Sequence, residues 1–389
     1  LLPSSIAGDD AMSSEGPKKV NFTYRAMDTG DMDNDGDLDI VVAESVTGRW
    51  DAEIGFYSKK IPPQIWENDG KGKFRISDSV IPLKSASEGS IQSVDLKLWD
   101  ITGNGYLEII YPADDHKKNG IEDAYKTSDL VIYSRLADGN YKNITSDKID
   151  TMALEFNGYW PASISIIDVN NDMHEDIVVT LSPWGGLNIK PSAIIYYNNG
   201  NGYFAADYVE VLNDWAGSFQ LFNDGSDDVI DAFQLPRGTT VEGNGSFLKI
   251  TGVLNEVRSD RTGSAGDDLL VGFGDGASIS PLEGNDKIVG ANGLDIVVFN
   301  KNKDDSIIQI GNDGSFQSVG FGSEINTLIS IERIKFLDRG IALDLSGNAG
   351  TTAKILGAFL GASGIQRTDL VGVGLDLLDS GATYEGFLQ

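Results

Sequence analysis

Cysteine is absent from the 389 residues, which excludes disulfide bonds, thiolate metal sites and a cysteine nucleophile. A small secreted domain without disulfides usually needs another stabilising element, and bound metal is one such element. No apolar run approaches the roughly 18 residues that a membrane-spanning helix requires. The chain also lacks an initiator methionine, and its first residues have neither the basic region nor the apolar core of an intact signal peptide. We therefore expect a processed product or a fragment of a longer protein.

Positive charge is scarce, because 30 lysines and arginines stand against 59 aspartates and glutamates and the formal net charge is −29. Such a surface repels nucleic acids and anionic membranes, which recruit basic patches. Neither is expected as a partner. Acidity suits a protein that gathers cations, although it can also serve solubility alone.

An acidic stretch occurs three times, each time directly before a short apolar run. The copies are DMDNDGDLD at 31–39, DITGNGYLE at 100–108 and DVNNDMHED at 168–176, and they begin 69 and 68 residues apart. A weaker fourth copy, NDGSDDVIDAF at 223–233, places Asp228 at the last motif position. This regular spacing indicates a repeat architecture.

A second element recurs between these stretches: IWENDGKGKF (65–74), IYSRLADGNY (132–141) and IYYNNGNGYF (195–204), with a degenerate copy in VEGNGSF (241–247). Asn-Gly and Asp-Gly between apolar runs are strong β-hairpin signals. Each repeat therefore holds a loop with its strand and a later hairpin. That is enough for one four-stranded blade, and repeated antiparallel blades predict a β-propeller.

Oxygen-bearing side chains at positions 1, 3 and 5, with glycine at position 6, are typical of a tight loop around a hard cation such as Ca²⁺. Glycine permits the sharp turn, and carboxylates this close would repel each other without a cation. An EF-hand has a similar loop but needs glutamate at position 12 and flanking helices. Position 12 here is Val42, Tyr111 or Val179, inside a β-like run. The sequence predicts a calcium loop that enters a strand.

These copies resemble the FG-GAP/VCBS repeat of integrin-like β-propellers in secreted and cell-surface proteins, over roughly residues 20–250. The resemblance implies three calcium sites, each formed by four side chains and one main-chain carbonyl. The first comprises Asp31, Asp33, Asp35 and Asp39 with the Asp37 carbonyl, the second Asp100, Thr102, Asn104 and Glu108 with the Tyr106 carbonyl, and the third Asp168, Asn170, Asp172 and Asp176 with the His174 carbonyl.

Departures from the motif grade these sites. The second loop has only two carboxylates and should bind calcium more weakly, and the third has Met173 where glycine is expected, which should strain the turn. The fourth copy has Gln220 and Phe222 at positions 1 and 3, so no ion is expected there. The alternative is that these loops cap strands without metal. Three clear blades do not close a usual propeller, so further blades are hidden in irregular sequence or lie upstream of Leu1.

Four nine-residue segments follow one another in register from residue 263. They are GSAGDDLLV (263–271), GFGDGASIS (272–280), PLEGNDKIV (281–289) and GANGLDIVV (290–298), and they match the pattern G-G-x-G-x-D-x-U-x of calcium-binding parallel β-rolls. The U position, an apolar residue buried between two sheets, is aliphatic in all four copies: Leu270, Ile279, Ile288 and Val297. A Gly/Asp-rich linker, the alternative, would not need this regularity.

This region resembles the RTX (hemolysin-type) repeat, in which repeats n and n+2 stack on the same side of the roll. The resemblance implies one good calcium site with Asp268 and Asp286. It implies a second, poor or empty site with Asp295, because Ala277 replaces the other aspartate. Pro281-Leu282 replace a glycine pair and should weaken even the good site.

The residues after the repeats change their pattern twice. Segment 326–350 resembles the end of RTX rolls, and its alternating Ile331, Ile334 and Phe336 predict capping strands. In the tail (351–389), apolar residues four apart, Ile355 with Phe359 and Leu356 with Leu360, predict an amphipathic helix. Residues 369–381 predict a second helix.

No catalytic motif stands out. The only histidines are His116 and His174; the pattern His-Glu-x-x-His of zinc proteases is absent, and so is G-x-S-x-G. We therefore favour a non-catalytic protein. A glycosidase or polysaccharide lyase stays open, because its carboxylates need not form a local motif, and His116 is the side chain to watch. Exposed tryptophans could stack on sugars, as in a carbohydrate-binding propeller.

We expect a mainly β protein with a propeller, complete or partial, at residues 1–250, an RTX-like roll at 251–300, a β capping segment at 301–346 and a helical tail at 347–389. The resemblances imply export by a type I system, with several calcium ions driving folding outside the cell. The expected function is calcium-dependent structure in a secreted or cell-surface protein that mediates adhesion or assembly. Glycans, other surface proteins and further copies of the chain are the expected partners besides calcium.

Overall fold

The computed structural model describes residues 22–46, 50–51, 55–56, 62–82, 90–92, 95–116, 128–150, 159–170, 172–183, 192–210, 219–222, 231–234, 248–250, 260–274, 276–310 and 316–383. The chain forms two compact units. The first contains residues 1–149, 153–198 and 206–257, and the second contains residues 150–152, 199–205 and 258–389.

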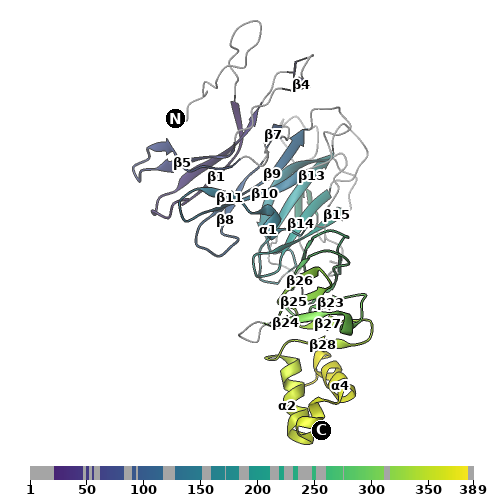
Figure 1. The fold of residues 1–389 in the computed structure, drawn as a ribbon. Helices are drawn as coiled ribbons and strands as arrows, with labels where there is room; N and C mark the ends of the chain where they lie inside the picture. The colour runs from purple at the N-terminus through teal and green to yellow at the C-terminus, as the bar shows by residue number, and fades with distance from the viewer. Residues whose placement is uncertain are drawn as a thin grey trace. The chain divides into compact units, whose positions relative to one another are not determined.

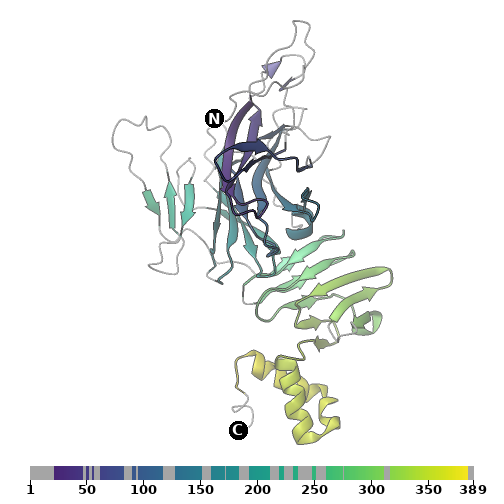
Figure 2. The same cartoon turned by 90° about the vertical axis from the view of Figure 1, so that its left-hand side faces the viewer.

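Four sheets, each of three to five strands, make up most of the first unit (Figure 1). The first has the order β1 (Phe22–Gly30), β2 (Asp39–Val46), β5 (Gln64–Asn68) and β6 (Phe74–Ile76), and the second has β11 (Tyr141–Asn143), β10 (Ser128–Arg135), β9 (Glu108–His116) and β7 (Ser90–Gln92), with β8 (Lys97–Trp99) also on β9. The third has β12 (Tyr159–Ile167), β13 (Asp176–Pro183), β14 (Ser192–Asn198) and β15 (Phe204–Glu210). The fourth, three short teal strands in Figure 2, has β16 (Phe219–Phe222), β17 (Asp231–Gln234) and β18 (Leu248–Ile250).

Two smaller elements complete this unit: the strand pair β3 (Trp50–Asp51) and β4 (Gly55–Phe56), and the short helix α1 (Thr145–Lys148). Neighbouring strands pair antiparallel in the first two sheets. None of the sheets formed by the described strands closes on itself. The prediction of a mainly β protein is therefore confirmed, and the propeller stays a prediction.

Each predicted loop leads directly into a strand that is buried on both faces. Segments 41–43, 109–111 and 177–179 follow the three loops and are buried throughout. Side chains from the first two sheets share one core, including Val41 and Ile65 from the first and Ile109 and Tyr133 from the second. The loops are therefore anchored at their C-terminal ends by buried strands.

Carboxylates also link successive sheets of the first unit. Asp28 Oδ2 accepts the Leu98 N–H at 3.0 Å, and Asp95 Oδ2 accepts the Ile164 N–H at 2.9 Å. Gly30 lies directly against the Leu107 side chain, where a Cβ would not fit. The sheets thus pack side by side through main-chain contacts as well as apolar ones.

Parallel strands distinguish the second unit (Figure 1). One sheet has the order β19 (Arg261–Thr262), β21 (Ser278–Ser280), β23 (Ile296–Val298), β27 (Arg333–Lys335) and β28 (Gly340–Ala342). The other has β20 (Leu269–Val271), β22 (Lys287–Val289), β26 (Glu324–Ile329), β25 (Phe316–Phe321) and β24 (Ile307–Ile310). The four nine-residue repeats alternate between these sheets, and within each sheet their strands pair in parallel.

The core of this unit lies between its two sheets. Leu270, Ile279, Ile288 and Val297 are completely buried in one cluster, which confirms the burial predicted for the U positions. Ile331, Ile334 and Phe336 join the same cluster. Strands β26 and β27 pair in parallel with β22 and β23, so they continue the two stacks beyond the repeats.

Segments 150–152 and 199–205 belong to the second unit although they lie far from it in sequence. The side chain of Asp150 accepts the Val271 N–H at 3.1 Å and lies 3.7 Å from the guanidinium of Arg261. That guanidinium stacks on Phe273, with 4.6 Å to the ring centre. A buried ion pair therefore anchors the start of the stack.

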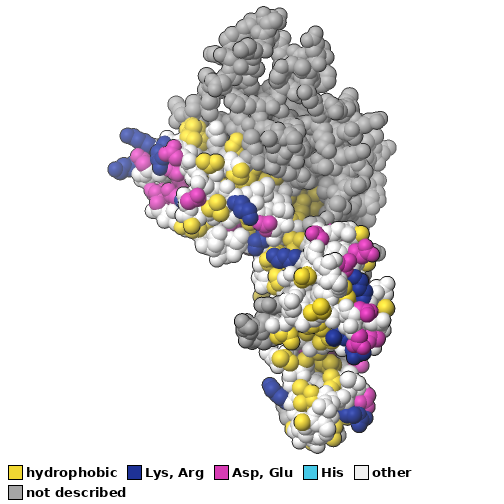
Figure 3. All heavy atoms as spheres, in the orientation of Figure 1, with side chains coloured by type: hydrophobic (Ala, Val, Ile, Leu, Met, Phe, Trp, Pro, Cys, Tyr) yellow, Lys and Arg dark blue, Asp and Glu magenta, His cyan; other side chains and the backbone are white. Residues whose placement is uncertain are grey.

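Helices form the C-terminal part, as the spacing of apolar residues predicts. After the turn η1 (Lys303–Asp305) and the last strands come α2 (Asn348–Leu360), α3 (Ala362–Ile365) and α4 (Thr368–Asp379). Ile355 and Leu356 are buried, whereas Phe359 and Leu360 are exposed. Figure 3 shows hydrophobic side chains at the surface of this helical part. Among the described residues, no helix has both the length and the apolar character needed to cross a membrane.

Candidate metal centres

The three loops before β2, β9 and β13 fold in the same way. The carboxylate at position 1, which is Asp31, Asp100 or Asp168, accepts the N–H groups of positions 5 and 6 at distances between 2.8 and 3.2 Å. The side-chain oxygen at position 5 accepts the N–H of position 7 at 2.7 to 3.0 Å. One local hydrogen-bond pattern therefore gives the three loops the same turn between positions 1 and 7.

Position 6 of each loop adopts the left-handed conformation that makes the sharp turn. Its φ is 95° at Gly36, 84° at Gly105 and 70° at Met173. Glycine takes this conformation freely, whereas a side chain makes it costly. The strain predicted for the third loop is therefore present at Met173.

The carboxylate at position 9 is buried in all three loops and ties each loop to its sheet. Asp39 accepts the N–H groups of Met32 and Asn68, both at 2.9 Å. Asp176 accepts those of Val169 at 2.9 Å and Asn198 at 2.7 Å. Burial raises the pKa of Asp39, and it raises the pKa of Asp176 to about 8. A bound cation would relieve the cost of burying these charges.

The first loop has the densest charge. Within the described part of the chain, Asp31, Asp33 and Asp39 form the one group whose carboxylate oxygens lie within 4.8 Å of one another. Burial and the charges of Asp35 and Asp39 raise the pKa of Asp33. The carboxylate of Asp37 lies against Gly70 in the β5–β6 turn. This placement is consistent with Asp37 offering its carbonyl rather than its side chain.

The second loop satisfies its buried carboxylate with protein donors. Glu108 Oε1 accepts the hydroxyls of Ser134 at 2.7 Å and Thr102 at 3.1 Å, and Oε2 accepts the Ile101 N–H at 2.9 Å. Burial raises the pKa of Glu108. The Gly105 carbonyl accepts a hydrogen bond from Asn34 of the first loop at 2.8 Å. With fewer carboxylates and more internal donors, this loop has less need of a cation.

The third loop lies between these two extremes. Asn170 Nδ2 donates to Asp172 Oδ2 at 2.9 Å, so one carboxylate of this loop already has an amide hydrogen bond. The carbonyl of His174 is the predicted main-chain ligand, and the His174 side chain is half-buried. Asp228 of the fourth copy and the side chains of Gln220, Phe222 and His116 lie outside the described residues.

Two of the loops are also held by asparagines of the hairpin that follows them, and the sequence analysis did not identify these residues. Asn68 and Asn198 end the third strand of their sheets, and each side chain donates to the carbonyl at loop position 8, from Asn68 to Leu38 at 3.3 Å and from Asn198 to Glu175 at 3.2 Å. The equivalent residue of the second sheet is Arg135, whose guanidinium lies over Tyr106. The shared asparagine in WEN and YYN was the available signal.

In the second unit, the structure brings Asp268 and Asp286 together. The Asp268 N–H donates to Asp286 Oδ1 at 3.0 Å, and Asp268 Oδ2 accepts the N–H of Ser264 at 2.6 Å. Asp286 is only 2% exposed, and within the part of the chain that the structure describes its Oδ2 has no hydrogen-bond partner. Burial, together with the negative charges of Asp268, Asp267 and Glu324, raises the pKa of Asp286 to about 6. The left-handed φ of 66° at Leu282 lies in the same repeat.

Asp295 has a different environment. Its Oδ1 accepts the Ala277 N–H at 2.7 Å and its Oδ2 accepts the Ala291 N–H at 2.8 Å, so both oxygens are already bonded. Its own N–H donates to Glu332 Oε2 at 2.9 Å. Burial raises the pKa of Asp295 to about 6. This is consistent with the weaker site that the sequence predicts here.

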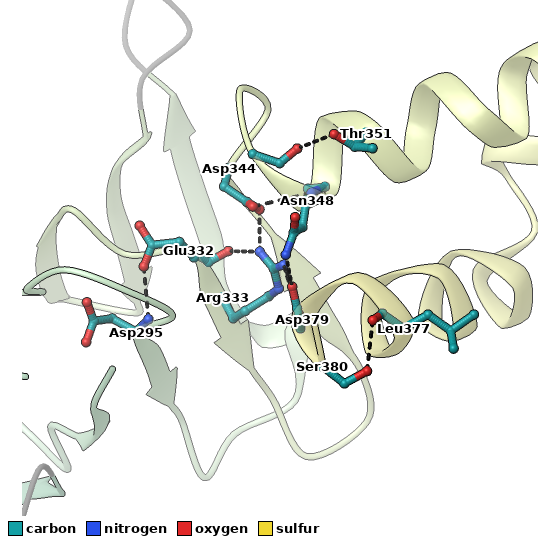
Figure 4. A network of polar contacts seen from close by, with 11 residues as sticks. Asp295, Glu332, Arg333, Asp344, Asn348, Thr351, Leu377, Asp379 and Ser380 are labelled. Atoms are coloured by element: carbon teal, nitrogen blue, oxygen red, sulfur yellow. Dashed lines mark hydrogen bonds and ion pairs between the residues drawn. The ribbon is translucent and has the colours of Figure 1, made fainter. Parts of the chain in front are cut away.

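Polar contacts of the residues after Glu332 attach the helical tail to β27 (Figure 4). Arg333 forms ion pairs with Asp344 and, at 2.8 Å, with Asp379 of α4, and it donates to the Glu332 carbonyl. Asn348 of α2 also donates to Asp379 at 2.8 Å. The Arg333 guanidinium therefore connects the last parallel strand to α4, and Asn348 joins α2 to the same Asp379 carboxylate.

Comparison with known proteins supports one part of this picture. A model of the FG-GAP-like repeat matches residues 31–111, from the first loop to the strand after the second. Such repeats are typical of extracellular proteins. A search of curated proteins found no match. The resemblance of residues 263–298 to RTX repeats stays a prediction.

Proposed function

We propose that this protein is an extracellular calcium-binding protein whose ions stabilise its two units after export. The observation that carries the proposal is the first loop, where three carboxylate oxygens lie within 4.8 Å of one another. Calcium takes six to eight oxygen ligands, and the loop offers carboxylates in that compact arrangement. Without a cation, the mutual repulsion of these groups opposes folding.

The second and third loops are weaker calcium sites in this proposal. They share the hydrogen-bond pattern of the first loop, but amide and hydroxyl groups replace part of its charge. In the second unit, the unpartnered oxygen of Asp286 beside Asp268 supports one calcium site of an RTX-like roll. Asp295, with both oxygens bonded, holds calcium poorly or not at all.

The biological role we propose is calcium-dependent structure in a secreted protein that mediates adhesion or assembly, with the first unit as an FG-GAP/VCBS-type propeller. Calcium is scarce inside cells and plentiful outside. Ions that bind only the native state stabilise it by mass action, so folding would follow export by a type I system. The match to an FG-GAP-like repeat supports the extracellular setting.

Chelation tests the calcium proposal. All six tryptophans lie in residues 1–257, so tryptophan fluorescence follows the first unit, while far-UV circular dichroism follows both. We expect excess chelator to lower the melting temperature by both probes and added calcium to restore it. For changes to the loop carboxylates, Asp138→Asn is the matched control, because Asp138 is an exposed turn aspartate outside the loops. An unchanged melting temperature in excess chelator would refute calcium binding.

A glycan array and a turnover assay on acidic polysaccharides test the proposed role. We expect calcium-dependent binding without turnover. If the protein cleaves a polysaccharide and one carboxylate change outside the calcium loops abolishes that cleavage, the protein is an enzyme, and adhesion is not its function.

A further inference from the structure

Asp268 and Asp286 belong to a ladder, in which the main-chain N–H of one residue donates to the side chain of the residue on the next strand of the stack. This ladder has a third rung outside the repeats. The Asp268 N–H donates to Asp286 Oδ1 at 3.0 Å, and in the same way the Asp286 N–H donates to Asn326 Oδ1 at 3.2 Å. The strand register agrees, since Leu270 pairs with Ile288 and Ile288 with Leu328. Asn326 thus occupies the structural position of the next repeat aspartate, although no repeat motif surrounds it.

The side chain of Asn326 differs from those of Asp268 and Asp286 in one atom, an amide nitrogen in place of a carboxylate oxygen. It is only 2% exposed, and its Nδ2 donates to the Val319 carbonyl across β25 at 3.5 Å. An aspartate here would direct a negative oxygen at that carbonyl instead of a donor. The amide N–H therefore provides the hydrogen-bond donor that the Val319 carbonyl needs. A carboxylate in its place would need a cation between it and that carbonyl.

Asp286 is left with one unsatisfied oxygen between these two neighbours. Its Oδ2 has no hydrogen-bond partner among the described residues, and the residue is only 2% exposed. Asp268 of the first rung is held at this carboxylate, because its N–H donates to Asp286 Oδ1 at 3.0 Å. A buried anionic oxygen is costly without a partner. The unsatisfied oxygen therefore favours a cation shared with the carboxylate of Asp268 over one beside the neutral amide of Asn326.

We infer that Asn326 is a positioning residue that ends this ladder, so that the ladder holds one divalent cation, between Asp268 and Asp286. Its Oδ1 holds the main chain of Asp286, and its Nδ2 takes the place of the positive charge that a further site would need. This inference rests on the proposed calcium binding of the second unit. It adds a residue outside the repeats that sets how many ions the ladder takes.

Asn326→Asp tests the inference in the full-length chain. We expect the variant to bind one more calcium ion per chain than the unchanged protein, measured by equilibrium dialysis. In chelator its melting temperature should fall below that of the unchanged protein, because a second buried carboxylate lacks a partner, and calcium should remove the deficit. An unchanged number of ions in the folded variant would overturn the inference.

Asn285→Asp is the matched control. Asn285 is adjacent to Asp286 and also uses both amide atoms, accepting the Ile325 N–H and donating to Asp267, but it is exposed. The same charge there is solvated, so no additional ion is expected. A gain of one ion in this control as well would show that added charge alone is sufficient, which would overturn the assigned role of Asn326.

Asn326→Ala keeps the test decisive if the aspartate variant does not fold. It removes the acceptor for the Asp286 N–H without adding charge, so the ion count should stay the same while the calcium affinity of this site falls by about 10- to 100-fold. Unchanged affinity would overturn the inference. Asp286→Asn separates the two proposals: if it leaves the calcium count of the unchanged sequence intact, the second unit does not bind calcium at Asp286 and the proposed function fails there.

Discussion

Each candidate site of the first unit takes its ligands from nine consecutive residues, whereas the candidate site of the second unit pairs two aspartates 18 positions apart. In the first unit, the loop closes around its own carboxylates, and the sheet only anchors its last position. In the second unit, no ligand pair exists until successive strands stack. The same carboxylate chemistry is therefore local in one unit and depends on the whole fold in the other.

This difference predicts two kinds of failure. A short loop loses little entropy on closure, so one loop can lose its ion while its neighbours keep theirs. A ladder is held by strand pairing and by the shared core around Ile279 and Ile288, so damage at one point should affect the complete stack.

Arg333→Met should have the largest effect on the second unit. The guanidinium is only 11% exposed and is paired with Asp344 and Asp379. Removing it leaves two carboxylates without their cation, at a cost of about 3–5 kcal/mol in the free energy of unfolding. Denaturation followed by far-UV circular dichroism should show the loss, while tryptophan fluorescence of the first unit should change little. Arg367→Met, at an exposed pair with Asp369, is the control and should change neither signal.

Asp31→Asn should remove one calcium contribution without unfolding the second unit. At a calcium concentration of 100 times Kd, a bound ion stabilises the native state by about 2.7 kcal/mol. That gain should be lost in the variant. Asp100→Asn should lose less, because Glu108 of the second loop already has protein donors on both oxygens. Equal losses in calcium titrations followed by thermal melting would contradict the proposed ranking of the loops.

The pH dependence of the calcium-free protein should be dominated by buried aspartates. Burial raises the pKa of Asp176 to about 8, and an unfolded aspartate titrates near about 3.9. The folded state therefore holds this proton more tightly than the unfolded state. Its contribution to stability is complete below the unfolded pKa and is lost as the pH rises through 8.

Chemical denaturation between acidic and mildly alkaline pH measures this effect. Asp176→Asn should reduce the slope of stability against pH, and so should saturating calcium, because both remove the uncompensated charge. The exposed Asp138→Asn should leave the slope unchanged above neutral pH, because hydrogen bonds from Asn140 lower the pKa of Asp138 and its carboxylate is charged there in both states. A slope that is the same in the Asp176 variant would show that another group dominates.

Met173→Gly should have the smallest effect and the opposite sign. A side chain in the left-handed conformation costs about 1–2 kcal/mol, so glycine should stabilise the third loop by about 1 kcal/mol. Gly36→Ala in the first loop should destabilise that loop for the same reason, since its φ is 95°. Equilibrium unfolding of the two variants compares them directly. Destabilisation by Met173→Gly would show that the methionine makes a compensating contact.

Local patterns were enough to predict much of the fold. The alternation of loops and hairpins predicted antiparallel sheets, and the four-residue spacing of Ile355 with Phe359 and of Leu356 with Leu360 predicted α2. Exposure was harder to predict, because Phe359 and Leu360 continue the same helical spacing but remain at the surface. Segments 150–152 and 199–205 carry no signal that places them in the second unit.

Taken alone, the sequence determined the nine-residue loops and the buried U positions. The two hydrogen bonds that the Asp31 carboxylate accepts come from N–H groups four and five residues later. The period of nine already places Leu270 and Ile288 in one core. Only the tertiary structure decided that Asn326 continues the ladder of Asp286, and that the Asn198 N–H meets Asp176. These partners lie far apart in the chain and meet only when strands pair in register. The pKa of Asp176 likewise depends on burial, which arises when the sheets pack.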